Sequence, residues 1–357
     1  MRGPMSERFA SPADLEACRR AIRGGSKSFY AASLLLPSGV RADAYALYGF
    51  CRRADDAVDD GRNPGAACID LSRRLDAIYA GRPGPDPVDR AFADLVEARA
   101  IPRALPGALI EGFVWDAQGR RFDTIGDVRA YGARVAGTVG VMMTLVMGVR
   151  DPHALARASD LGVAMQLTNI ARDVGEDARA GRLYLPRQWM EEAGLDPDAF
   201  LAAPCFSPQL AQVIARVLDE ADRLYERARP GVALLPSGCR AAIHAASRIY
   251  RDIGGQIRRA GFDSVTRRAA TSKRRKLALA AAGLLDAAGA GRQDAGGPLA
   301  ETRFLVQAVP PAPPRAPDLA WWRLGEHWGR MFEILHALEQ REQAALRQSM
   351  ASRQRRG

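Results

Sequence analysis

The sequence predicts an all-α fold built as one large helical domain. Alanine, leucine and arginine, which favour helices, are abundant, and few stretches alternate apolar and polar residues as half-buried strands do. The chain has 357 residues, of which 47% are hydrophobic and 26% are charged, an ordinary balance for a globular protein. This length is ample for a large buried core.

The five cysteines bear on the cellular compartment. Their number is odd and no pair has C-x-x-C spacing, so they predict free thiols in a reducing cytoplasm rather than disulfides or a zinc site. The N-terminus lacks the apolar stretch of a secretory signal. We therefore expect a cytoplasmic protein.

The chain is strongly basic, with a net charge of +10 and an isoelectric point of about 9.8. Such a charge favours nucleic acid, an anionic membrane surface or a polyanionic substrate. No basic stripe interleaved with aromatic residues and no helix-turn-helix or zinc pattern is visible, so no nucleic-acid partner is expected. A polyanionic substrate handled at a membrane surface would explain the same charge.

The first helix is expected to begin at Ser11 and Pro12, because a serine cap followed by proline is typical of a helix start. After two glycines come Ser26, Lys27 and Ser28. Hydroxyls beside a lysine in this setting suit a loop or helix start that closes on phosphate oxygens. An ordinary helix boundary is the alternative.

A first acidic stripe follows in the segment 48–60. At helical spacing, Tyr48, Arg52, Asp55 or Asp56, and Asp59 share one face. Asp55 and Asp59 are one turn apart, and like charges at that spacing destabilise a helix unless a cation lies between them.

The middle of the chain reads as further helices. A loop at 61–65 precedes a helix with Leu71, Leu75 and Ile78 on one face, and two helical segments fill 88–123. The very apolar stretch 131–149 contains an arginine and several glycines, so it predicts a core helix beside an apolar cavity rather than a membrane span.

A second acidic stripe lies between residues 166 and 186. Gln166, Asn169, Asp173 and Asp177 follow one another at steps of three, four and four, on one face of a helix with apolar flanks. A partly buried stripe of acids and amides requires a partner. Oxygen ligands without histidine or cysteine suit Mg²⁺ or Mn²⁺.

The two stripes are distant in sequence and can cooperate only by packing face to face around one cavity. Magnesium usually binds one or two carboxylates together with substrate phosphates, so the expected ligand is a phosphorylated molecule held through metal ions. The alternative, for either stripe alone, is a solvated helix face neutralised by the neighbouring Arg52 or Arg172.

The C-terminal third is predicted to contain a loop at 198–208, amphipathic helices at 209–229 and 238–260, and a basic run at 272–276 that faces solvent or anionic headgroups. We expect the helical domain to occupy 1–285. Residues 286–317 have the Pro/Gly/Ala composition of a linker. Residues 318–357 are expected to form an amphipathic helical tail. Docking on its own core is the default expectation, and a partner or a membrane surface is the alternative.

The motifs resemble those of the squalene and phytoene synthase group of isoprenyl diphosphate synthases, and within it the bacterial phytoene synthases. The resemblance rests on D-D-x-x-D at 55–59 and Q-x-x-N-I-x-R-D-x-x-x-D at 166–177, followed by R-x-Y-x-P at 182–186. It covers about three quarters of the chain. It implies an all-α isoprenoid synthase bundle around a central apolar cavity.

The resemblance also implies roles for individual residues. The metal ligands would be Asp55, Asp59, Asn169, Asp173 and Asp177. The diphosphate would be held by Arg52, Arg172, Arg267, Ser26, Lys27 and Ser28. The later stage of the reaction would be guided by Tyr48, Gln166 and Tyr250, and the tunnel wall would include Val135 and Gly140. Some relatives carry histidine at the position of Gly25. Glycine also occurs at this position in phytoene synthases.

The implied reaction is the head-to-head joining of two geranylgeranyl diphosphates to phytoene through a cyclopropylcarbinyl diphosphate, the first committed step of carotenoid biosynthesis. Mg²⁺ or Mn²⁺ is the implied cofactor. No NADPH is expected, because no nicotinamide-binding glycine motif is present. A membrane surface and other carotenoid-pathway enzymes are the implied partners. The alternatives are a C30 synthase making dehydrosqualene or hydroxysqualene, and a catalytically silent scaffold.

Small side chains after Ser28 bear on substrate length. Ala31, Ala32 and Ser33 would leave room for a long prenyl tail, where shorter-product relatives carry a bulky aromatic residue near Ser33. The alternative is that these residues simply allow close helix packing.

Overall fold

The computed structural model describes residues 8–59, 63–286 and 296–311, and these residues belong to one compact unit, Met1–Pro311. Every regular element in the described part is helical, so the predicted all-α class is confirmed. The expected tail at 318–357 lies outside the described residues. The expected linker at 286–317 is described only over residue 286 and residues 296–311.

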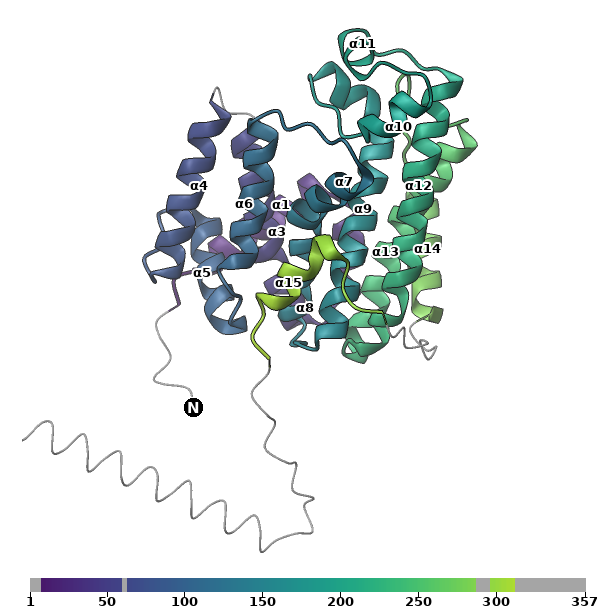
Figure 1. Cartoon of the computed structure of the whole chain (residues 1–357). Helices are drawn as coiled ribbons and strands as arrows, with labels where there is room; N and C mark the ends of the chain where they lie inside the picture. Colours follow the sequence, from purple (N-terminus) through teal and green to yellow (C-terminus); the bar gives the residue numbers. More distant parts are fainter. Residues whose placement is uncertain (1–7, 60–62, 287–295, 312–357) are drawn as a thin grey trace, which may run out of the picture. The chain divides into compact units, whose positions relative to one another are not determined.

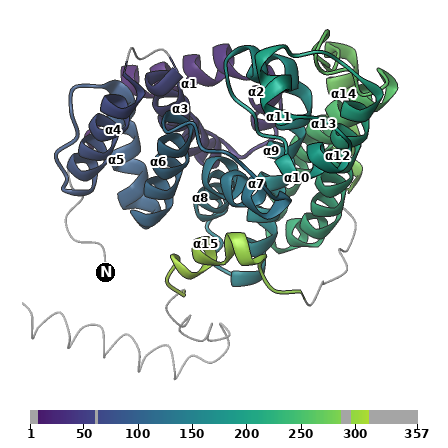
Figure 2. The ribbon, with the colours of Figure 1, turned by 45° about the horizontal axis from the view of Figure 1, so that its top comes forward.

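Most of the N-terminal helices build one side of the molecule, whereas α2 (Lys27–Ser33) also packs against C-terminal helices. The N-terminal helices are α1 (Pro12–Gly25), α2, α3 (Ser38–Asp59), α4 (Pro64–Tyr79), α5 (Pro87–Arg99) and α6 (Ala104–Ala117). In Figures 1 and 2, α4, α5 and α6 stand together at the side opposite α12, α13 and α14.

The central segment contains the longest helix. Its elements are α7 (Ile125–Gly132), a π-helical turn η1 (Ala133–Gly137), α8 (Thr138–Val146), α9 (Pro152–Arg179), α10 (Arg187–Glu192) and α11 (Pro197–Ala202). The stretch expected as a single core helix at 131–149 is thus divided by η1. The loop expected at 198–208 is also wrong in part, because Asp196 caps α11 through the amide nitrogens of Asp198 and Ala199.

The C-terminal helices complete the bundle. They are α12 (Pro208–Ala228), a 3₁₀ turn η2 (Arg229–Leu234), α13 (Ser237–Arg259), α14 (Lys273–Asp286), a 3₁₀ turn η3 (Ala300–Thr302) and α15 (Arg303–Gln307). Helix α9 packs against α12, α13, α8 and η1, so it is the central element to which the others are attached.

A recurring local signal explains many helix starts. Six helices begin with proline, directly after a residue whose side chain accepts a hydrogen bond from the first turn. Proline fits there because the first-turn N–H has no helical partner. The cap and proline pairs are Ser11–Pro12, Asn63–Pro64, Asp86–Pro87, Asp151–Pro152, Asp196–Pro197 and Ser207–Pro208.

Glycines bring α9 into backbone contact with its neighbours. A Cβ added to Gly162 would lie 2.4 Å from the carbonyl oxygen of Ala136, and one added to Gly140 would lie 2.4 Å from the carbonyl oxygen of Ala158. Any side chain at either glycine would therefore separate α9 from η1 and α8.

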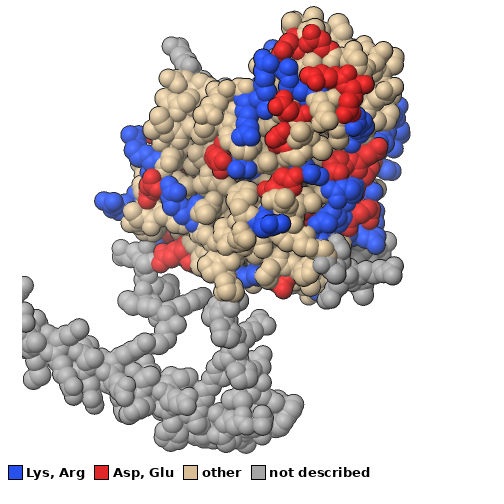
Figure 3. Space-filling view, viewed as in Figure 1, with Lys and Arg blue, Asp and Glu red and all other residues tan. Residues whose placement is uncertain are grey.

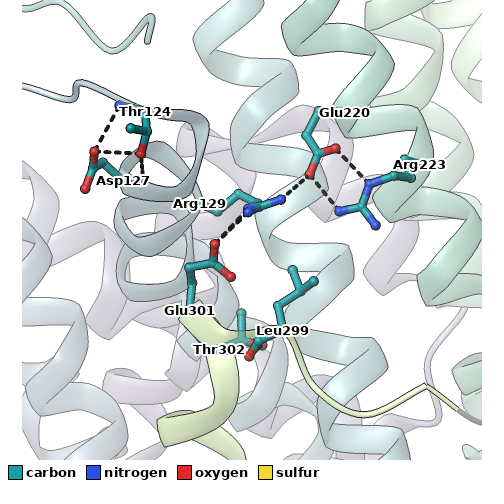
Figure 4. Close-up of polar contacts among 8 residues, drawn as sticks. All are labelled: Thr124, Asp127, Arg129, Glu220, Arg223, Leu299, Glu301 and Thr302. Carbon is teal, nitrogen blue, oxygen red and sulfur yellow. Dashed lines mark hydrogen bonds and ion pairs between the residues drawn. The ribbon is translucent and has the colours of Figure 1, made fainter. Parts of the chain in front are cut away.

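Residues 296–311 do not form the linker that their composition suggests. Leu305 and Thr302 are fully buried, and Leu305 packs on η1 beside Gly137. Arg129 donates two hydrogen bonds to Glu301, at 3.0 and 2.7 Å (Figure 4). We call residues 296–311 the C-terminal strap. Its apolar residues Leu299, Phe304 and Leu305 bury against the bundle, which a solvated linker would not do.

Charges of both signs are intermixed on the molecular face drawn in Figure 3, and no single-sign stripe crosses the described part of that face. Many charged side chains of the described part form ion pairs, for example Arg251 with Asp222 and Arg258 with Asp219. Among the described residues, no helix combines the length and the apolar character that crossing a membrane requires.

Candidate active site

A cavity of about 790 Å³ runs through the bundle, within the range typical of small-molecule sites. One part of its wall is polar and the rest is largely apolar. Most of the residues selected from the sequence line it, namely Ser26, Lys27, Ser28, Tyr48, Arg52, Asp55, Val135, Gly140, Gln166, Asn169, Arg172 and Tyr250. The expected convergence of the two stripes on one cavity is present.

The first acidic stripe belongs to α3. Arg52 lies between two carboxylates, with Nη1 3.3 Å from Asp55 Oδ2 and Nη2 2.6 Å from Asp56 Oδ1. Asp55 lines the cavity, whereas Asp56 does not. Asp59 is the last residue of α3, and its side chain lies outside the described part of the structure.

The second stripe belongs to α9, and two arginines hold its Asp173. Arg172 Nε donates to Asp173 Oδ1 at 2.8 Å, and Arg268 Nε donates to the same oxygen at 2.7 Å. Burial opposes ionisation of Asp173, but these hydrogen bonds outweigh it and lower the pKa of the carboxyl. Asp173 is therefore a carboxylate at neutral pH.

The segment that carries Arg268 is fixed to α9 by its backbone. The amide nitrogen of Gly175 donates to the carbonyl oxygen of Ser264 at 2.9 Å, and a Cβ on Gly175 would lie 2.5 Å from the carbonyl oxygen of Val265. Asp263 accepts hydrogen bonds from the next residues of the turn, including the amide of Val265. This close approach places Arg268 at Asp173.

Two other groups of the second stripe, on Asn169 and Asp177, have surroundings that differ from those of Asp173. The buried Oδ1 atom of Asn169 has no hydrogen-bond partner among the described residues. Burial and the nearby charge of Asp173 raise the pKa of Asp177 to about 7, although Arg182 acts in the opposite direction. Amide and carboxylate oxygens are suitable ligands for Mg²⁺, so this donor set fits such an ion.

The carboxylates are not gathered into a ready-made cage. Within residues 8–59, 63–286 and 296–311, no group of three or more His, Cys, Asp or Glu side chains is close enough to hold a metal ion. Asp173 and Asp177 do not line the cavity itself. The arginines that contact Asp55, Asp56 and Asp173 supply positive charge where the sequence alone suggested metal ions.

The segment around Ser26 forms a helix boundary and also faces the cavity. Ser26 Oγ accepts a hydrogen bond from the amide nitrogen of Phe29 and so caps α2. The segment can therefore be both an ordinary helix boundary and a segment that faces a phosphate group in the cavity. A Cβ on Gly25 would lie 2.5 Å from the hydroxyl oxygen of Tyr48, so glycine at this position makes room for that tyrosine.

Phe29 joins two of the selected tyrosines. Its ring centroid is 6.4 Å from that of Tyr48 and 5.0 Å from that of Tyr250. Burial raises the pKa of Tyr48, and it raises that of Tyr250 to about 12 although the charge of Arg172 opposes the shift. Both phenols therefore keep their protons at neutral pH.

The arginine expected from the sequence to bind phosphate does not line the cavity. The side chain of Arg267 is 71% exposed, does not line the cavity and faces Asp263 at 3.9 Å. Arg268 lines the cavity instead. No periodicity distinguishes two adjacent arginines in a non-helical segment, so only the backbone contact at Gly175 could decide between them.

Sequence reasoning also missed Lys276, which was assigned to a basic run facing solvent or headgroups. Lys276 lines the cavity. Burial and then the positive charges of Lys27 and Arg172 lower its pKa, so these three cations lie within electrostatic reach of one another. Such a cluster is suited to a polyanion such as diphosphate.

A hydrogen-bonded triad was missed as well. Asp116 accepts from the hydroxyl of Tyr131 at 2.8 Å and from that of Tyr184 at 2.7 Å, and all three residues line the cavity. The two tyrosine rings stack with centroids 5.0 Å apart. Tyr184 belongs to the R-x-Y-x-P motif, but no sequence pattern connects it with Asp116, 68 positions earlier.

The apolar part of the cavity is lined by small and flexible side chains. They include Ala32, Ser33, Leu36, Met143, Met147, Ala154, Ala158, Val232, Leu235, Ala242 and Ala246. Ser33 is buried and its hydroxyl donates to the carbonyl oxygen of Tyr30 at 2.7 Å. Ala31 does not line the cavity, so the small residues after Ser28 face it only in part.

Comparison with known proteins agrees with this geometry. Residues 22–275 match the Squalene/phytoene synthase family. The chain is 58% identical over 272 residues to a phytoene synthase of Rhodobacter capsulatus, an alignment that covers 75% of this chain and 80% of the relative. It is 57% identical over 275 residues to a phytoene synthase of Cereibacter sphaeroides, with 74% and 78% covered.

A solved structure resembles the fold in the same region. It is that of a dehydrosqualene synthase in complex with a ligand, with a TM-score of 0.70 and 32% sequence identity. The similarity covers 76% of this chain and 95% of that one. The fold of this chain thus has a counterpart in a solved enzyme structure.

Proposed function

The chain belongs to the squalene/phytoene synthase family, and on that premise we propose that it joins two geranylgeranyl diphosphates head to head to give phytoene, with release of diphosphate. It is thus a prenyltransferase. One observation carries the proposal: a single cavity has cations, carboxylates and amides in one part of its wall and a long apolar surface in the rest. A substrate with a diphosphate head and a prenyl tail needs both the polar part and the apolar part of this wall.

The cations of the polar part bind the leaving group. Lys27, Arg172 and Lys276 supply positive charge for phosphate oxygens, and Arg268 adds a guanidinium able to make two parallel hydrogen bonds. Departure of diphosphate breaks a C–O bond and leaves an allylic cation. Donors placed in advance around the departing oxygens stabilise the charge that develops there.

The proposed metal ligands are Asp55, Asp59, Asn169, Asp173 and Asp177. When bound, Mg²⁺ or Mn²⁺ would neutralise part of the charge on the diphosphate. The unpartnered Oδ1 of Asn169 and the raised pKa of Asp177 support this ligand set. The same cavity is lined by the side chains that are proposed to guide the later stage of the reaction, namely Tyr48, Gln166 and Tyr250.

The apolar lumen protects the cation from water. Its wall includes Val135, Val139 and Gly140, with no charged side chain from this stretch of η1 and α8. Excluding water prevents capture of the cation as an alcohol. The two protons lost in the overall reaction leave with diphosphate or through a tyrosine, and the stacked pair Tyr131 and Tyr184 lies in the same wall.

The product distinguishes this proposal from its rivals. Purified protein, Mg²⁺ and C20 or C15 diphosphate, without NADPH, should yield a C40 hydrocarbon from the C20 substrate, detected by mass analysis, and chelation of the metal should abolish it. A C30 hydrocarbon made only from the C15 substrate would favour a dehydrosqualene-type synthase. No turnover by wild-type protein would favour a scaffold.

Peripheral membrane contact is part of the proposal. Leu277 on α14 is 75% exposed and lies near the exposed basic Arg274. Helix α14 packs against α2, which ends at the exposed Leu34. An apolar tip beside basic residues suits an anionic surface. Binding to anionic vesicles should weaken in Leu277→Glu. Other carotenoid-pathway enzymes are proposed partners, since the product does not dissolve in water.

A further inference from the structure

Arg157 is a buried arginine in the wall of an apolar cavity. Only 2% of its side chain is exposed, yet it lines the cavity beside Ala154, Ala158 and Val232. It lies 16 residues before Asp173 on the same helix, α9. At a rise of 1.5 Å per residue, the two are about 24 Å apart along the helix axis. Arg157 thus belongs to the end of the cavity remote from the diphosphate site.

The aliphatic part of Arg157 lies against η2. A Cβ added to Gly231 would be 2.2 Å from Arg157 Cβ and 2.7 Å from Arg157 Cγ, so the methylene groups rest directly on the glycine backbone. Gly231 lines the cavity together with Val232 and Ala158, so these methylene groups pack among residues of the apolar wall.

The guanidinium group points away from the apolar lumen. Nε of Arg157 is 3.0 Å from Oδ2 of the fully buried Asp160, and Nη2 donates to the carbonyl oxygen of Gly297 at 3.0 Å. Gly297 is exposed and belongs to the C-terminal strap. The side chain of Arg157 thus extends across the wall, from the cavity to the outer surface of the molecule.

The strap is anchored independently of Arg157. Arg129 bonds to Glu301 and also to Glu220 of α12 at 3.0 Å, as Figure 4 shows. Leu305 packs on η1 beside Gly137. The family match ends at residue 275, so the strap lies outside the region shared with the whole family.

A second arginine makes the same polar contacts without reaching the cavity. Arg227 of α12 is 3.3 Å from Asp160 Oδ2 and donates to the carbonyl oxygen of Gly297 at 2.9 Å. It does not line the cavity. Asp160 thus pairs with both arginines through the same oxygen, Oδ2.

We propose that Arg157, held in place by Asp160 and the C-terminal strap, is the floor of the hydrocarbon tunnel and limits the length of the prenyl tail. The inference rests on the proposed function. The tail extends from the cationic site toward Arg157, and its last isoprene unit meets the methylene groups of that side chain. A longer tail would have to displace a side chain fixed by a buried ion pair.

The test compares variants of the full chain. For each, kcat/KM is measured with C20 and C25 prenyl diphosphates. Arg157→Ala removes the floor and should raise the C25-to-C20 ratio by at least about 10-fold, the discrimination typical of a hydrophobic pocket that gains or loses small groups. Arg157→Met keeps a long apolar stem but lacks the ion pair that fixes it, so its ratio should lie between those of wild type and Arg157→Ala. Arg227→Ala, the matched control, breaks the same contacts to Asp160 and Gly297 and should leave the ratio unchanged.

An unchanged ratio in Arg157→Ala, or an equal rise in Arg227→Ala, would overturn the proposal. If Arg157→Ala does not fold, Ala158→Leu decides the matter. Its added bulk beside Arg157 should shift preference from C20 toward C15 diphosphate, and no shift would count against a floor at this level. Failure of wild-type protein to convert the C20 substrate would instead refute the proposed function, so the two failures are distinguishable.

Discussion

Arg268 holds the second-motif carboxylate of Asp173 through two hydrogen bonds, Nε to Oδ1 at 2.7 Å and Nη2 to Oδ2 at 3.3 Å. The two residues are 95 positions apart and meet because the backbone at Ser264 is bonded to Gly175. A cation that lines the cavity is thus placed beside an acid proposed to hold metal. The same guanidinium can serve either the acid or a phosphate oxygen.

The pair of adjacent arginines gives the sharpest test of the diphosphate site. Arg268→Ala should raise the KM for the diphosphate substrate about 10-fold or more, because a hydrogen bond to a charged group contributes about 1.5–3 kcal/mol. Arg267→Ala should change KM less than about twofold, as expected of an exposed residue. Steady-state kinetics on both variants shows which of the two arginines contributes to binding of the diphosphate. A larger effect at Arg267 would show that the cavity-lining arginine has been misassigned.

Asp173→Asn should reduce kcat at least about 100-fold, because an amide of nearly the same shape carries no charge for the leaving-group complex. Product formation from C20 diphosphate is the measurement, with circular dichroism to verify folding. Glu176→Gln is the control, since Glu176 is 62% exposed and also contacts Arg268, at 3.2 Å. An exposed ion pair is worth at most about 1 kcal/mol, so this control should lose less than about fivefold. Equal losses in both variants would contradict a role for Asp173 in the chemistry.

Ser33→Phe should shorten the accepted prenyl tail. Ser33 is buried in the cavity wall, and an aromatic ring there would fill space that the C20 tail uses. We expect kcat/KM for C15 relative to C20 diphosphate to rise about 10-fold. Leu34→Phe is a neighbouring control on an exposed side chain and should leave the ratio unchanged. Retention of the wild-type preference in Ser33→Phe would mean that the small residue serves helix packing alone.

Glu220 should stabilise the fold in a pH-dependent way. Burial opposes its ionisation, but hydrogen bonds from Arg223 and Arg129 outweigh burial and lower the pKa of the carboxyl. The pKa is lower in the folded than in the unfolded chain, so the stabilisation is complete above the unfolded value of about 4.5 and is lost as the pH falls through the folded value. Glu220→Gln should therefore lower the free energy of unfolding by about 1–3 kcal/mol at pH 7. Denaturant titrations should show this difference shrinking below about pH 4.5.

The control for that measurement is Glu226→Gln. Glu226 lies on α12, as Glu220 does, and pairs with Arg251 of α13, but its side chain is 53% exposed. An exposed pair contributes less than about 1 kcal/mol, so the variant should differ little from wild type. If Glu220→Gln lost no more stability than this control at pH 7, the network shown in Figure 4 would not anchor the strap.

The helices and the two acidic stripes could be predicted from the sequence because they depend on local spacing. Steps of three and four residues put Gln166 and Asn169 on one face of α9 whatever surrounds the helix, and both line the cavity. The cap and proline pairs at six helix starts are equally local signals. The start at Ser11–Pro12 was predicted from such a pair.

The remaining parts of the site depend on contacts between distant segments. The choice of Arg268 over Arg267 is made by the backbone contact at Gly175, and Lys276 lines the cavity only because α14 packs on α13. At the strap, the alanine and proline content predicts a linker and gives no sign of buried anchors such as Leu305. None of these contacts leaves a periodic signature.

Gly162 and Gly140, where α9 meets η1 and α8 main chain to main chain, limit how this enzyme could be engineered. At that level of the cavity, these two positions offer no bulky side chain that could be truncated to widen it. Enlarging either glycine would instead force the two walls apart. Libraries aimed at new substrates should therefore leave both codons untouched and diversify positions where a replaceable atom already borders the lumen.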